Sequence, residues 1–126
     1  MDRQNWIGRL ERIERIRKCI GAKRLTDPHD TDGTCLRGTV KCNYDELLTA
    51  FGEPVLEGLD GKTDAEWNIR FPDGTISTIY NWKNGKNYCG HKGLPLWTIG
   101  EWNVGGNTGA APRMVQDAIT YVRSVK

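Results

Sequence analysis

The residues best suited to chemistry in this sequence gather around one predicted hairpin, "DGTISTIYNWKNGKNYCG" (residues 73–90). Aromatic rings can stack on flat bases, amides can bind base edges or ribose hydroxyls, and cationic groups can meet phosphates. This combination predicts an open pocket for a small molecule of the adenine-nucleotide type. The residues that we expect to line it are Trp82, Asn81, Lys83, Arg70, Trp102, Asn103 and Arg113.

These side chains also have structural interpretations, which the sequence leaves open. Trp82 and Tyr80 are residue types that fill cores as well as binding surfaces. Lys83 and Lys86 are typical solvated charges at the end of a hairpin. Arg113 lies at a predicted helix start, where the helix dipole disfavours a cation, so an anion, an acidic neighbour or plain solvation would each account for it.

The sequence lacks the motifs of catalysis, so we expect a protein that is not an enzyme and needs no cofactor. Only His29 and His91 offer the usual proton shuttle, and neither lies in a nucleophile or metal motif. No P-loop, GxSxG or HExxH motif occurs. The glycines of "NVGGNTGAAP" precede a predicted helix and could cradle an anion, but an ordinary strand-to-helix loop has the same composition.

The cysteines raise the question of a structural metal. Cys35, Cys42, Cys89 and His91 could together supply four zinc ligands. Their spacing differs from the C-x₂₋₄-C knuckles that structural zinc sites usually contain. We therefore expect free, partly buried thiols and no metal, with the zinc site kept as an alternative.

Charge is distributed unevenly along the 126 residues. The formal net charge of +2 is too small to imply nucleic-acid binding by itself. Lys and Arg outnumber Asp and Glu by eight to three in residues 1–24, so a basic segment precedes a mildly acidic body. Nucleic acid is a partner that we consider but do not favour. No signal peptide or membrane-spanning stretch is recognisable, which predicts a cytoplasmic protein without a membrane partner.

The chain is expected to form one α+β domain over residues 1–126: a small antiparallel sheet with three helices packed on it. Residues 1–24 are predicted to form a basic amphipathic helix, and residues 43–126 a sheet-and-helix core. Residues 25–38 resemble a loop. Asn43 and Glu46 predict a capping box for a short middle helix, and Pro112 begins a C-terminal helix. The apolar stripe of the first helix consists of Trp6, Ile7, Leu10, Ile13, Ile16 and Ile20.

The clearest strand pattern is a hairpin formed by "WNIRF" and "TISTIYNWK", followed by a third strand in "LWTIGEWNVGG" (residues 96–106). A two-residue loop at Asp73-Gly74 would bring the apolar side chains of the hairpin to one face. Arg70 and Asn81 would then share the other face. The expected pairs are Phe71 with Ile76, Ile69 with Thr78, and Trp67 with Tyr80.

Residues 44–106 resemble a recurrent type of small phage and prophage protein. The shared features are an LxxxFGxP helix end, a W-x-I/V-x-F-x-DGT hairpin, a TIYxWK strand and a closing W-x-I/V-GG. In size and aromatic content the chain is similar to the Thoeris anti-defence family. Proteins of that family sequester cyclic ADP-ribose-type signals, and some hold cyclic oligonucleotides, without cleaving them. The resemblance implies a homo-oligomeric binder of a nucleotide signal, with pockets between subunits.

The leading hypothesis is therefore a non-enzymatic phage anti-defence protein that binds and sequesters a cyclic nucleotide or cyclic ADP-ribose-type immune signal. One alternative is a protein-binding inhibitor of a bacterial defence system, similar to an anti-CRISPR, that uses the N-terminal helix or an exposed tryptophan as its contact. The other is a zinc-assisted nucleic-acid-binding protein.

Overall fold

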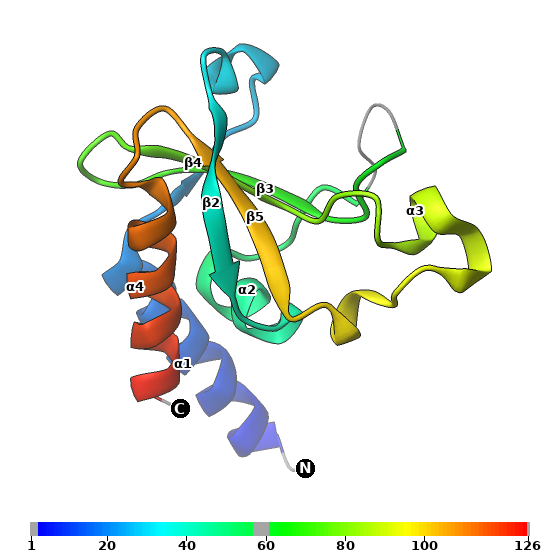
Figure 1. Ribbon diagram of the computed structural model, residues 1–126. Coiled ribbons are helices and arrows are strands. Elements are labelled where there is room, and N and C mark those ends of the chain that lie inside the picture. Colours follow the sequence, from blue (N-terminus) through cyan, green and yellow to red (C-terminus); the bar gives the residue numbers. More distant parts are fainter. Residues whose placement is uncertain (1–2, 57–60, 126) are drawn as a thin grey trace.

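The computed structural model describes residues 3–56 and 61–125 and shows an α+β fold, as expected (Figure 1). Its five strands form one antiparallel sheet in the order β1-β3-β4-β5-β2. The strands are β1 (Lys23–Arg24), β2 (Cys35–Lys41), β3 (Glu66–Arg70), β4 (Ile76–Tyr80) and β5 (Glu101–Gly106). The α-helices are α1 (Arg3–Ile20), α2 (Tyr44–Phe51), α3 (Lys86–Cys89) and α4 (Ala111–Ser124). Short 3-10 turns are η1 (Pro28–Thr31), η2 (Gly90–Lys92) and η3 (Leu96–Thr98).

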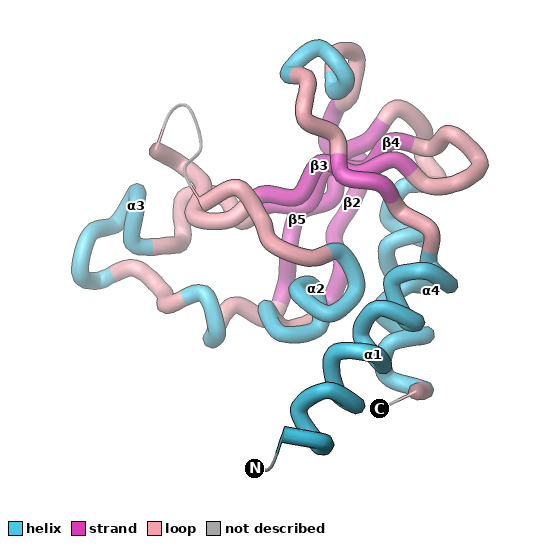
Figure 2. The backbone as a smooth tube through the Cα atoms, turned by 180° about the vertical axis from the view of Figure 1, so that it is seen from behind, coloured by secondary structure: helices cyan, strands magenta, loops and turns pink. Residues whose placement is uncertain are grey.

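One face of the sheet carries the hydrophobic core and is covered by helices. Trp67 of β3 and Trp102 of β5 meet edge to face, with their ring centroids 5.5 Å apart. Leu47 of α2 and Ile119 of α4 are fully buried in the same core. Complete burial of such an aliphatic side chain contributes about 1.5–3 kcal/mol. Figures 1 and 2 show α4 and α3 at opposite sides of the molecule, so α3 takes no part in this layer.

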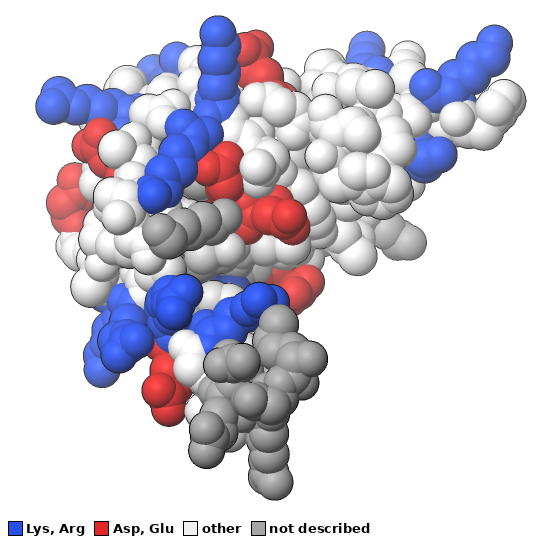
Figure 3. Space-filling view, turned by 90° about the horizontal axis from the view of Figure 1, so that it is seen from below, with Lys and Arg blue, Asp and Glu red and all other residues white. Residues whose placement is uncertain are grey.

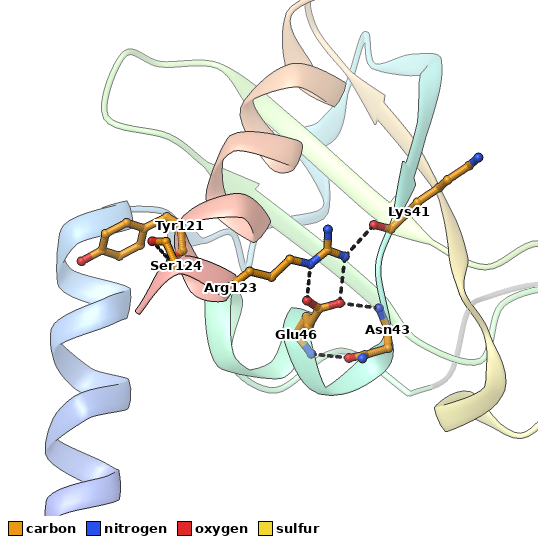
Figure 4. Close-up of polar contacts among 6 residues, drawn as sticks. All are labelled: Lys41, Asn43, Glu46, Tyr121, Arg123 and Ser124. Atoms are coloured by element: carbon orange, nitrogen blue, oxygen red, sulfur yellow. Dashed lines mark hydrogen bonds and ion pairs between the residues drawn. The ribbon is translucent and has the colours of Figure 1, made fainter. Parts of the chain in front are cut away.

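The predicted capping box of the middle helix is confirmed, and it also joins two helices (Figure 4). Asn43 Oδ1 accepts the backbone N–H of Glu46, and Glu46 Oε1 accepts the backbone N–H of Asn43. Arg123 of α4 donates to both oxygens of the same carboxylate and to the carbonyl of Lys41. The N-terminus of α2, the end of β2 and the last turn of α4 are thereby held together.

The first helix docks only over its second half. Ile16 is buried, and Arg17 donates to the carbonyls of Leu48 and Thr49 at the end of α2. Ile7 and Leu10 are 44% and 43% exposed, so the stripe predicted for this helix is not covered near its start. The side chain of Trp6 lies outside the described part of the chain. No helix within 3–56 and 61–125 is long and apolar enough to cross a membrane.

The predicted hairpin is present, but its predicted register is wrong by one residue. Trp67 pairs with Ile79, not with Tyr80. The loop contains three residues between Phe71 and Thr75, whose backbones pair at 2.9 Å, and Gly74 adopts a φ of +92°. Three-residue hairpins commonly end in such a left-handed residue. Because side chains alternate along a strand, the one-residue change moves every side chain of β4 to the other face.

Two further strands were not predicted. The helix expected over residues 1–24 ends at Ile20, before Gly21 with its φ of +71°, and residues 23–24 form β1, which pairs with β3. Residues 35–38, expected within a loop, begin β2, which pairs with β5 along Cys35–Lys41. The register shifts between Leu36 and Gly38, and Arg37 at this bulge donates to the carbonyl of Gly106. The third predicted strand is shorter than expected, because residues 96–98 form η3 and β5 begins at Glu101.

Candidate ligand-binding groove on the open face of the sheet

The face of the sheet opposite the core carries partly exposed side chains and forms the candidate site. We call it the open face. Alternate residues of β3 and β4 point to it, because paired residues of antiparallel strands lie on the same side. A groove of about 330 Å³ runs along it, within the usual range for ligand pockets. Its lining comprises Thr31, Thr34, Cys35, Leu36, Thr63, Glu66, Asn68, Thr78, Tyr80 and Trp82.

The middle of the groove offers both donors and acceptors to a ligand. Glu66 of β3 pairs across the sheet with Tyr80 of β4, and Asn68 Nδ2 lies 3.3 Å from Glu66 Oε2. Burial, with a smaller contribution from the Glu66 carboxylate, raises the pKa of Tyr80. The phenol therefore stays protonated near neutral pH and remains a hydrogen-bond donor. Thr63 is 4% exposed, and its Oγ1 has no hydrogen-bond partner among the described residues.

One end of the groove is an indole ring beside two cations. Trp82 is 44% exposed and packs edge-on against Tyr80, with ring centroids 6.3 Å apart. The ammonium Nζ atoms of Lys62 and Lys83 lie 5.4 and 5.7 Å from the indole centroid. Lys83 has a positive φ of +58°, an uncommon backbone conformation for a residue other than glycine. A ring face beside two ammonium groups suits a ligand that joins an aromatic ring to an anionic group.

Two of the predicted ligand residues lie on the covered face instead. Trp102 is fully buried in the core. Asn81 is 1% exposed, and its amide is used by the protein itself: Oδ1 accepts the N–H groups of Asp64 and Ala65, and Nδ2 donates to Asp64 and Asn84. The expectation that Arg70 and Asn81 share a face fails with the predicted register, because Arg70 pairs with Ile76 on the open face.

The other predicted residues are exposed to different degrees and are not all brought together. Trp82 and Lys83 meet at the end of the groove. Asn103 pairs with Tyr80 on the open face, beside the groove but outside its lining. Arg70 is exposed at the far end of β3, directly opposite Lys23 of β1. Arg113 is exposed on α4 and takes no part in the groove.

Glu66, Asn68 and the threonines of the groove were missed as site residues. The alternation of "EWNIR" does carry the necessary signal: Glu66 and Asn68 alternate with Trp67 and Ile69, so they must face away from the core. What the sequence did not show is that Tyr80 and Trp82 lie on the same face of the sheet as Glu66 and Asn68. That follows only from the three-residue loop.

The alternative of a zinc site depends on whether the cysteines and histidines lie close together. Within residues 3–56 and 61–125, no three side chains of His, Cys, Asp or Glu come together as metal ligands. Cys42 is buried, and burial followed by the nearby Glu46 charge raises its pKa to about 12. Cys35 lies exposed in the groove, and Cys89 donates its S–H to the Lys83 carbonyl.

Comparisons of the chain with protein-family models, with curated proteins and with solved structures return no match.

Proposed function

We propose that this protein binds and sequesters a small molecule of the adenine-nucleotide type in the groove of the open face, without cleaving it. The observation that carries the proposal is the Trp82 indole, half-exposed at the end of the groove and flanked by the ammonium groups of Lys62 and Lys83. A nucleotide presents the matching pair of features, a flat base and a negatively charged phosphate.

The groove offers a distinct partner for each part of such a ligand. The base stacks on Trp82 or Tyr80, and the Lys83 ammonium group, now over the indole, turns to the phosphates. The exocyclic amino group of adenine is a donor, and the Glu66 carboxylate is an acceptor in the middle of the groove. The hydroxyls of Thr31 and Thr34 also line the groove; each donates to a backbone carbonyl of its own segment and can still accept a hydrogen bond from a ribose hydroxyl.

The biological role in this proposal is anti-defence: the protein of a phage would capture a cyclic ADP-ribose-type or cyclic nucleotide signal in the cytoplasm of its bacterial host. Support for this role comes from the resemblance of residues 44–106 to small phage proteins. The same resemblance supports a homo-oligomer. The uncovered Ile7 and Leu10 of α1 are compatible with self-association, which light scattering coupled to size-exclusion chromatography will test.

Calorimetry tests the binding. We expect heat with at least one member of a panel of AMP, ADP-ribose, cyclic ADP-ribose isomers and cyclic di- and trinucleotides, and recovery of that compound unchanged by mass spectrometry. The absence of heat with every member, at protein concentrations well above micromolar, would remove the proposal. Recovery of a cleaved compound would show an enzyme instead.

A pair of tryptophan variants separates stacking from general damage. Trp82→Ala should weaken nucleotide binding by about 1–3 kcal/mol, the usual worth of one stacked base. Trp97→Ala removes an equally large ring that is 75% exposed and lies outside the groove, so it should leave nucleotide binding unchanged. Equal losses in the two variants would contradict the assignment of Trp82 as the stacking platform.

A further inference from the structure

The segment between β4 and β5 projects from the sheet (Figure 1) and is basic. We call residues 82–100 the arm; it contains α3, η2 and η3 and stands apart from α1 and α4 (Figures 1 and 2). It contains Lys83, Lys86 and Lys92 and no Asp or Glu. In Figure 3 the part that protrudes to the right shows basic but no acidic side chains on the face in view.

Hydrogen bonds fasten the base of the arm to the sheet. Asp64 is 8% exposed and accepts hydrogen bonds from the Asn81 amide and the backbone N–H of Asn87. The two sides of the arm meet where the backbone N–H of Leu94 donates to the carbonyl of Asn84 at 2.9 Å. These contacts fix the arm in one shape, so the positions of its side chains are set before a partner arrives.

Rings and cations alternate where the arm leaves the sheet. Lys62 Nζ lies 5.4 Å from the Trp82 ring, and Lys83 Nζ lies 5.7 Å from the Trp82 ring and 5.5 Å from the Tyr88 ring. One ammonium group thus stands between two aromatic rings. Further along the arm, Trp97 is 75% exposed. The order of groups where the arm begins is therefore cation, ring, cation, ring: Lys62, Trp82, Lys83 and Tyr88.

We infer that the arm binds single-stranded nucleic acid. A single strand alternates a flat base with a phosphodiester, and proteins hold it by stacking bases on aromatic rings beside a cationic track. Lys83 between Trp82 and Tyr88 matches one phosphate between two bases. An acidic protein surface would meet the same lysines but has no matching series of flat rings. This activity is additional to nucleotide capture in the groove, since Tyr88 and Trp97 lie outside the groove lining.

Fluorescence anisotropy with labelled oligothymidylate and oligouridylate of about fifteen nucleotides provides the test, at a site size typical of such binders. Affinity should fall with salt, with a slope of about −2 to −3 in log K against log salt, because each of three or four contacted phosphates contributes about −0.7. Tyr88→Ala and Trp97→Ala should each weaken binding by roughly 5- to 150-fold. Lys83→Gln should weaken it and reduce the slope by about 0.7.

Controls separate the arm from the other basic surfaces. Arg113→Gln removes an exposed charge on α4 and should change neither affinity nor slope. Thermal unfolding and circular dichroism should show that Tyr88→Ala and Trp97→Ala remain folded. No anisotropy change with about 100 µM protein at low salt, the weak limit of non-specific binding, would overturn the inference. So would binding that survives both ring variants but is lost on replacing Arg9 and Arg12 of α1.

The measurements distinguish the arm from the groove, although the two share Trp82. Oligonucleotide binding that is lost in Tyr88→Ala and Trp97→Ala, while nucleotide calorimetry is unchanged, supports a nucleic-acid site that extends along the arm beyond the groove. Oligonucleotide binding without heat from any nucleotide in calorimetry would support a nucleic-acid site on the arm and remove the proposed function. Heat from a nucleotide without oligonucleotide binding would support nucleotide capture in the groove and remove the inference about the arm.

Discussion

Asn81 and Asp64 bind each other across the start of the arm: Asn81 Nδ2 donates to Asp64 Oδ1 at 3.0 Å, and Asn81 Oδ1 accepts the Asp64 backbone N–H at 2.7 Å. Both side chains are buried. This reciprocal pair closes the polypeptide that connects α2 to β3 onto the end of β4. Beside this pair the chain turns from the core to the open face: the Asn81 side chain is buried, whereas that of its neighbour Trp82 is half-exposed.

Replacing Asn81 should destabilise the protein. Asn81→Ala removes four hydrogen bonds and leaves the Asp64 carboxylate and two buried N–H groups without this partner. We expect a loss of about 2–4 kcal/mol in the free energy of unfolding, measured by urea denaturation. Asn84→Ala is the matched control: it removes one of these bonds and should cost about 1 kcal/mol or less. Similar losses in both variants would contradict a framework role for Asn81.

Two glycines permit the close approach that shapes the arm. A Cβ atom on Gly93 would lie 2.3 Å from the carbonyl oxygen of Gly85, a backbone atom that cannot rotate away. Gly93→Ala should therefore lower the melting temperature by several degrees, as expected for a loss of about 1–3 kcal/mol through overpacking. Gly100→Ala meets nothing within 4 Å and should leave it almost unchanged. Equal melting temperatures in the two variants would show that the backbone of the arm can move apart at Gly85 and Gly93 at little cost in stability.

The parts of the fold that were predicted correctly depend on short-range chemistry. The Asn43–Glu46 capping box needs only three residues of separation, and its geometry is present. The hairpin was recognised from alternation, but its register depends on whether the turn holds two or three residues, a difference that "PDG" alone does not decide. Strand β2 was missed because its partner β5 lies far along the chain and a bulge interrupts its pattern.

How well the site residues could be predicted depended on the strand register, because the register decides which face of the sheet each side chain lies on. Trp82 and Lys83 were correctly expected to lie together, because they are adjacent in sequence. Asn81 and Trp102 were assigned by residue type, which does not report the face of a strand, and both lie inward. Glu66 entered the groove unpredicted for the same reason, since its pairing with Tyr80 requires the observed register.

The ion pair between Glu46 of α2 and Arg123 of α4 should stabilise the protein by joining the two helices (Figure 4). Glu46 is 7% exposed, and Arg123 donates to both of its oxygens. Arg123→Met removes both of these charge-assisted hydrogen bonds and should cost about 1–3 kcal/mol, less than a fully buried pair because half of the arginine side chain is exposed. Adding Glu46→Gln should restore part of the loss. Additive losses in urea denaturation of the double variant would argue against direct coupling.

Stability should decrease at alkaline pH through Cys42. Its pKa is raised to about 12 in the folded protein, from the ordinary 9.0, so above pH 9 the unfolded chain releases a proton that the folded chain retains. Ionisation then favours unfolding, with a slope that approaches about 1.4 kcal/mol per pH unit between pH 9 and 12 and vanishes below pH 9. Denaturant unfolding at pH 8 and 10.5 will measure it. Cys42→Ala should show a shallower decline, and parallel declines would assign the effect to other groups.

The Glu66 carboxylate should make the groove selective for adenine over hypoxanthine. Adenine presents an amino donor where hypoxanthine presents a carbonyl, and a carboxylate accepts hydrogen bonds but repels a second acceptor. An adenine nucleotide should bind about 12- to 150-fold more tightly than its inosine counterpart, as expected for one unmade hydrogen bond to a charged group. Glu66→Gln introduces an N–H donor that can pair with the hypoxanthine carbonyl and should reduce that ratio towards one, whereas Glu101→Gln, at an exposed acid of β5 outside the groove lining, should not. Calorimetry with the AMP and IMP pair decides the matter. An unchanged ratio in Glu66→Gln would place the base elsewhere, even if Trp82→Ala still weakens binding.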